Sequence, residues 1–254
     1  MRTLGIDLAT VPSRTAVCTV SWDGTGAVAD FSTEPATDKA LIAACRTADK
    51  VGIDCPFGWP DSFVAALVAH RDAQTWPGRG LPDGAAFRRY LSYRETDRFV
   101  QVTTGVWPLS VSANFIGLTA TRCAGLLDAL APVDRAGTGQ VAEVYPAAAL
   151  RVWGLWQQGY KKQDLKGRKT LGEMLDGLCA KTPTLRFAPG AKQRCRASHD
   201  AFDALICALV ARAAACGLTT APQNEEQRRR ALTEGWIQLP TGCTHDLSRA
   251  LAAP

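Results

Sequence analysis

The sequence predicts an α/β fold with a mixed sheet, for three reasons. Residues 3–7 and 51–54 are short apolar runs that each end in a single aspartate. The runs 14–22 and 27–33 flank an Asp-Gly dipeptide, which is typical of a hairpin between antiparallel strands. A helix-like segment, 37–50, separates this hairpin from the strand at 51–54, and such a crossover makes strands parallel neighbours.

The first elements also carry start and stop signals. Thr37 can cap the helix over 37–50, where apolar residues recur at helical spacing. Pro56 cannot continue the strand at 51–54. If the strands at 3–7 and 51–54 are parallel neighbours, Asp7 and Asp54 lie at the same end of the sheet, where open α/β sheets place their functional crevice.

The middle of the chain has a different pattern. Helical segments at 61–72 and 116–130 flank a Pro- and Gly-rich loop at 76–84. We interpret this region, about 60–135, as a helical insertion in a single domain that spans residues 1–254.

The remaining elements complete the predicted sheet and its covering helices. Residues 140–146 form a short strand in which Glu143 precedes a stopping proline. Helices follow at 147–156, 168–181 and 199–217, with Gly217 as a C-cap and an apolar stripe on the last helix. Residues 234–240 are expected to add a short edge strand.

The amino-acid composition limits the classes of protein to which this chain can belong. Of 254 residues 46% are hydrophobic and 21% charged, as in globular proteins, and no apolar run approaches the ~20 residues of a membrane span. With no signal-peptide pattern, we expect a cytoplasmic protein. Nine cysteines without a C-x-x-C pair argue against a disulfide framework or zinc ribbon, and most are expected to be buried apolar residues. The net charge of +5 is compatible with a nucleic-acid partner.

Five acids are candidates for a metal site. Asp7, Asp54 and Glu143 end predicted strands, and Asp200 and Asp203 lie three residues apart on the last helix. Mg²⁺ or Mn²⁺ prefers oxygen ligands, and two such ions ~4 Å apart can cleave a phosphodiester. Each acid also has a structural interpretation, because Asp54 could cap a turn and Asp200 could stabilise a helix N-terminus.

These acids resemble those of the ribonuclease H-like superfamily. That fold has three antiparallel strands, a helix and further strands parallel to the first, with acids on the first strand, the fourth strand and a final helix. Asp7, Asp54, Asp200 and Asp203 match those positions, and the helix pair is similar to that of RuvC-type resolvases. The resemblance implies a metal-dependent nuclease in which Asp7 bridges two ions, Asp54 and Asp203 each hold one, and Asp200 or Glu143 completes the shell.

The chain resembles more closely a group of bacterial and archaeal proteins described as predicted RNase H-like nucleases, which carry a domain of unknown function. The shared motifs span most of the chain: GIDLAT (5–10), IDCPFGWP (53–60), YRETDRFV (93–100), EVYPAAALR (143–151), GYKK (159–162) and HDAFDALICAL (199–209). The resemblance implies DNA or RNA as the partner.

Other residues are candidates for substrate binding. Arg94 could clamp a phosphate or pair with Asp97 at i, i+3. Lys161 and Lys162 could meet a nucleic-acid backbone or be surface lysines. His199 could ligate a metal, transfer a proton or be a polar residue at a helix start.

Two other functions are open at this stage. GIDLAT also resembles the first phosphate loop of sugar kinases and actin-like ATPases, but the chain has no Gly-Gly dipeptide for a second glycine-rich loop and is short for two such domains. A non-catalytic module that binds nucleic acid or protein is the other possibility. Five tryptophans could then line a base-stacking groove, although buried tryptophans are more common: Trp59, Trp76, Trp107, Trp153 and Trp156.

Overall fold

The computed structural model describes residues 1–241, and within them one mixed sheet of six strands forms the centre of the molecule. In spatial order the strands are β5 (Val141–Glu143), β4 (Lys50–Asp54), β1 (Arg2–Asp7), β2 (Ala16–Trp22), β3 (Ala27–Phe31) and β6 (Leu185–Phe187). β1 pairs antiparallel with β2 and β2 with β3, whereas β4 is parallel to β1, β5 is parallel to β4 and β6 is parallel to β3. This confirms the mixed α/β sheet.

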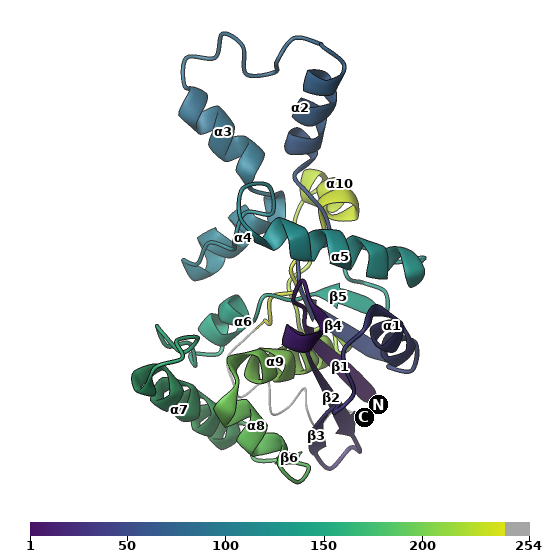
Figure 1. Cartoon of the computed structure of the whole chain (residues 1–254), viewed down its shortest axis with the longest axis vertical. Helices are drawn as coiled ribbons and strands as arrows, with labels where there is room; N and C mark the ends of the chain where they lie inside the picture. The colour runs from purple at the N-terminus through teal and green to yellow at the C-terminus, as the bar shows by residue number, and fades with distance from the viewer. Residues whose placement is uncertain (242–254) are drawn as a thin grey trace.

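One face of the sheet is covered by α9 (His199–Ala215), which packs on β1, β2 and β4 (Figure 1). Every residue from Ala201 to Ala213 is buried, so this helix is apolar nearly all round, as a helix within a core must be. Three further helices complete this side: α6 (Pro146–Val152), α7 (Leu165–Lys181) and α8 (Ala191–Ala197).

The opposite face is covered by α1 (Asp38–Arg46) and α5 (Ile116–Ala129). Thr37 caps α1 as predicted, since its hydroxyl accepts a hydrogen bond from the Ala40 N–H at 3.3 Å. Leu4 and Ile6 of β1 point into this layer. The central strands β1 and β4 are therefore buried on both sides, whereas β2, β3 and β6 carry exposed polar residues: Ser21, Asp30 and Arg186.

The cysteines support this core. Six of them are buried, as predicted for small apolar side chains: Cys18, Cys45, Cys55, Cys123, Cys195 and Cys207. Cys243 lies outside the described residues.

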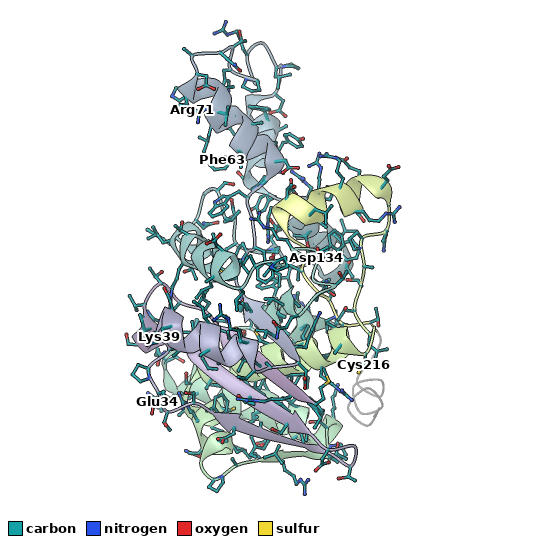
Figure 2. The ribbon with its side chains drawn as sticks, turned by 90° about the vertical axis from the view of Figure 1, so that its right-hand side faces the viewer. Glu34, Lys39, Phe63, Arg71, Asp134 and Cys216 are labelled. Carbon is teal, nitrogen blue, oxygen red and sulfur yellow. The ribbon has the colours of Figure 1, made fainter. Side chains whose placement is uncertain are left out.

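Three helices from the segment after β4 stand beyond the end of the sheet: α2 (Asp61–Arg71), α3 (Gly84–Ser92) and α4 (Glu95–Thr104). We call them the cap, and α10 (Glu225–Glu234) packs against α2 and α4 (Figure 1). In Figure 2, Phe63 and Arg71 mark α2 at the end of the molecule far from the strands.

A single buried carboxylate links the cap to α10. The Glu234 side chain accepts the N–H of Asp61 at 2.9 Å and the N–H of Glu95 at 2.7 Å. These are the first residues of α2 and α4, whose N–H groups have no partner within their own helix. One side chain near the end of the described chain therefore caps two helices.

Some elements differ from the predictions. The helix expected over 147–156 ends at Val152, before Gly154 at φ +64°. The edge strand expected at 234–240 is reduced to two isolated bridges, one between Ile237 and Glu143 and one between Pro240 and Thr219. The helices α3, α8 and α10 and the strand β6 were not predicted. No helix within residues 1–241 is long and apolar enough to cross a membrane.

Candidate metal centre

Asp7 and Asp54 end β1 and β4, and the two residues are direct partners in the parallel register. Parallel neighbours lie ~4.8 Å apart, so the two carboxylates are held side by side. Each aspartate follows a glycine by two residues, Gly5 and Gly52, and in a strand such residues share a face. This face is the one that α9 covers.

The two glycines explain how α9 comes so close. A Cβ added at Gly5 would overlap the backbone of Ala204, and one added at Gly52 would overlap the Cys207 carbonyl oxygen. Without side chains at these positions, the backbone of α9 lies directly on the strands. Asp203, one residue before Ala204, is thereby brought to the strand ends.

The three acids form one group. Asp7, Asp54 and Asp203 each offer a carboxylate oxygen, and these oxygens lie within 4.8 Å of one another. Burial is the main cause that raises the pKa of Asp7 well above its usual range, and the charges of Asp54 and Asp203 add to it. Burial and the same crowding raise the pKa of Asp54 to about 7. Without a cation, the group therefore retains protons near neutral pH.

Two residues of the GYKK motif hold Asp203, which is fully buried. The Tyr160 hydroxyl lies 3.1 Å from Oδ1, and the Lys161 Nζ lies 2.7 Å from Oδ2. Partial burial acts to lower the pKa of Lys161, but Asp203 outweighs it and the net shift is upward. The Lys161 side chain is 49% exposed, so this ion pair connects the buried Asp203 to a residue that reaches the solvent.

Two cavities meet at Asp7. One, of about 200 Å³, contains Asp7, Asp54 and Lys161 and has apolar walls that include Pro108 and Ile116. The other is an open groove of about 440 Å³ lined by Asp7 and Asp200, among others. Asp7 and Asp54 therefore face these cavities, whereas Asp203 is fully buried behind them.

Asp200 lies in the open groove, separate from the three-acid group. Its Oδ1 is 2.8 Å from the Nδ1 of His199, and this contact is the main cause that lowers the pKa of Asp200. Arg14 lines the same groove. Asp200 is thus positioned beside Asp7 rather than within the buried cluster.

Residues 5–227 match a protein family described as "Protein of unknown function (DUF429)". The chain belongs to the DUF429 family. No curated protein and no solved structure matches it.

In this DUF429 chain, Glu143 and Arg94 bind each other. Arg94 donates to both carboxylate oxygens of Glu143 at 2.9 and 2.7 Å, and to those of Asp97 at 3.2 and 2.8 Å. Its fifth bond goes to the Glu234 carbonyl oxygen at 3.0 Å. All five N–H donors of Arg94 are thus used, and the side chain is 1% exposed.

These contacts match the second role considered for Arg94, the ion pair with Asp97, and leave it no donor for a phosphate. Glu143 lines the smaller cavity, but its carboxylate is engaged by Arg94 and by the Phe57 N–H at 3.0 Å. The structure therefore does not bring Glu143 into the group formed by Asp7, Asp54 and Asp203. Lys162 lines a separate hollow beside Lys166 at the start of α7.

The three acids of the DUF429 chain fit a divalent cation. Carboxylate oxygens are the ligands that Mg²⁺ and Mn²⁺ prefer. Three ionised carboxylates and the Lys161 ammonium leave a net charge of 1 − 3 = −2, which one divalent ion neutralises. Burial is the main cause of the raised pKa of Asp7 and of Asp54, and the charge of Asp203 adds to both, so a bound cation would favour the ionised form of these acids.

Sequence reasoning did not assign a role to three residues of this site. Gly5 and Gly52 have a visible signal, since both aspartates occur in the triplet Gly-Ile-Asp. Tyr160 directly precedes the two lysines that were considered, but nothing in the local pattern connects it to Asp203, which is 43 residues away.

Proposed function

We propose that this protein is a divalent-metal-dependent nuclease that hydrolyses phosphodiester bonds in nucleic acid. The observation that carries the proposal is the group of Asp7, Asp54 and Asp203, whose oxygens lie within 4.8 Å of one another at the carboxyl end of the sheet. Two of these acids, Asp7 and Asp54, line a cavity. The strand order β3-β2-β1-β4-β5 supports it, because antiparallel strands followed by parallel ones are what the ribonuclease H-like resemblance implies.

The residues of the chain have distinct roles in this proposal. Asp7 and Asp54 hold Mg²⁺ or Mn²⁺ together with Asp203. When bound, such an ion stabilises the charge on a phosphodiester and activates water for attack. Tyr160 fixes the orientation of Asp203, and the exposed part of Lys161 offers a positive charge to a phosphate oxygen. Apolar walls at Pro108 and Ile116 limit bulk water.

The test combines metal binding with cleavage. Binding of Mn²⁺ and Mg²⁺ is measured by calorimetry for the wild type, for Asp7→Asn, and for Asp128→Asn as a control that removes an exposed acid of α5. The same proteins are incubated with single-stranded, duplex and branched DNA and RNA. We expect the wild type and the control to bind metal and cleave, and Asp7→Asn to do neither.

A wild type that binds no metal would leave the acids with a structural role only and would end the nuclease proposal. Nucleic-acid binding without metal or cleavage would favour the non-catalytic module instead.

A further inference from the structure

A further hollow lies in the cap, on the side of α3 and α4. It has a volume of about 330 Å³, and we call it the cap pocket. Its walls combine three aromatic residues with two arginines: Tyr90, Tyr93, Trp107, Arg89 and Arg98. Asp83 also lines it, and its carboxylate accepts the Ala86 N–H at the start of α3 at 2.8 Å. None of these residues belongs to the carboxylate site.

The aromatic residues present open ring surface. Tyr93 packs against Trp107 with ring centroids 4.3 Å apart, which fixes the indole in place. Trp107 and Tyr90 are nevertheless each 43% exposed. Large rings that are both held in place and exposed are suited to stack on a planar ligand.

The two arginines supply positive charge beside these rings. Arg98 lies over the Tyr90 ring at 5.2 Å, donates to the Tyr90 carbonyl oxygen at 2.9 Å and lies 3.7 Å from Glu95. Arg89 is exposed, and within residues 1–241 its side chain makes no hydrogen bond or ion pair. Its guanidinium group is therefore available for an anionic ligand such as a phosphate.

The cap pocket also adjoins the carboxylate cavity. Trp107 lines the cap pocket, and Pro108, the next residue, lines the cavity that contains Asp7 and Asp54. Consecutive Cα atoms are ~3.8 Å apart, so one segment of chain separates the two hollows. A ligand that contacts both hollows has to be longer than a single nucleotide.

We propose that the cap pocket binds one nucleotide of a single-stranded nucleic acid, with the base stacked on Trp107 and a backbone phosphate bound by Arg89. A single strand combines an open base face with a phosphate, whereas the bases of a duplex are stacked on each other. This inference rests on the proposed nuclease function for its substrate, and it selects single strands, or single-stranded parts of branched substrates, as that substrate.

The test measures binding without cleavage. Fluorescein-labelled single-stranded DNA and RNA and a matched duplex are titrated with the full-length protein in EDTA, and anisotropy is recorded. The variants are Trp107→Ala, Trp107→Phe and Arg89→Ala. The matched controls are Trp76→Ala and Arg79→Ala, which remove an exposed tryptophan and an arginine of the same region outside the cap pocket. Thermal melting verifies that each variant is folded.

We expect Trp107→Ala to weaken single-strand binding about 5- to 100-fold, the range of one base–aromatic stack, while Trp107→Phe retains most of it. Arg89→Ala should reduce the salt dependence of single-strand binding by about 0.7 in the log–log slope, as for one lost phosphate contact. The controls should bind like the wild type, and the duplex should bind more weakly than either single strand.

Several results would overturn the inference. One is equal binding by Trp107→Ala and Trp76→Ala. Another is that dextran sulfate abolishes the binding equally in all variants, which would mean that charge alone holds the nucleic acid. The two proposals fail separately, because binding through Trp107 without cleavage by the wild type contradicts only the nuclease. Cleavage that is insensitive to Trp107→Ala and Arg89→Ala contradicts only the cap pocket.

Discussion

Asp54 shows how its neighbours set the chemistry of a single carboxyl group. Burial, with the charge of Asp203, raises its pKa to about 7, against 3.8 for an unperturbed aspartate. At pH values between 3.8 and about 7, the folded protein therefore binds more protons at Asp54 than the unfolded chain does. The free energy of unfolding therefore falls as pH rises through this window.

We predict that the metal-free protein loses on the order of 2 kcal/mol of stability between pH 5 and pH 8 from this site. Urea unfolding in EDTA at several pH values measures the effect. Asp54→Asn is the control and should show a flatter profile over this range. Millimolar Mn²⁺ should oppose the loss, because the cation binds the ionised carboxylates. A metal-free stability that increases over this range would contradict the prediction.

Lys161 neutralises part of the acid cluster in the absence of metal. We predict that Lys161→Met lowers the stability of the metal-free protein by about 1–3 kcal/mol, because Asp203 is buried and loses its ion pair. The same variant should bind Mn²⁺ more tightly, since the net charge of the ionised site changes from −2 to −3. Unfolding and calorimetry measure both effects.

The control for this prediction is Lys162→Met, which removes a neighbouring lysine that lines a different hollow. It should change neither stability nor metal affinity appreciably. Weaker Mn²⁺ binding by Lys161→Met would mean that the lysine helps to build the cation site rather than competing with it.

At the scale of elements, the contact between α9 and the strands β1 and β4 determines the geometry of the site. We predict that Gly5→Ala costs at least ~3 kcal/mol of stability, because its Cβ overlaps the backbone of α9, which cannot rotate away. The displaced helix carries Asp203 with it, so Mn²⁺ affinity should also fall. Chemical unfolding and calorimetry test the two effects together.

Gly125→Ala is a matched control, because Gly125 lies within α5 and a Cβ there meets nothing within 4 Å. This substitution should stabilise the protein by ~0.5–1 kcal/mol, as expected for alanine in a helix. Equal stability of Gly5→Ala and Gly125→Ala would contradict the prediction, because it would mean that α9 does not require glycine at position 5.

The sequence allowed prediction of the elements whose signal is local. β1, β4 and α9 have continuous apolar runs or stripes, and their acids follow from strand ends and helix spacing. α10 was missed because only Ala231 and Glu234 of its residues are buried, so no apolar stripe shows in a helix that its tertiary contacts stabilise. The partner of Glu143 could not be predicted either, because Arg94 is 49 residues away in the cap.

At the scale of the whole molecule, Arg94 joins the sheet, the cap and the last residue of α10. We predict that Arg94→Lys destabilises the protein by ~3–5 kcal/mol, because an ammonium group cannot replace five fixed donors and leaves buried carboxylates unpaired. Thermal unfolding measures the change. Arg88→Lys, at an exposed position of α3, is the control and should leave the midpoint unchanged. A midpoint that is equally unchanged in Arg94→Lys would mean that this network contributes little.

The double cap formed by Glu234 has a consequence for the order in which the protein is made. The helices α2 and α4 begin at residues 61 and 95, but the carboxylate that caps both is translated 173 and 139 positions later. On the ribosome the N-terminal strands can pair early, whereas the cap waits for nearly the whole described chain to emerge. Until then the first turns of α2 and α4 lack the carboxylate that they share. The cap is therefore completed after the strands that carry Asp7 and Asp54.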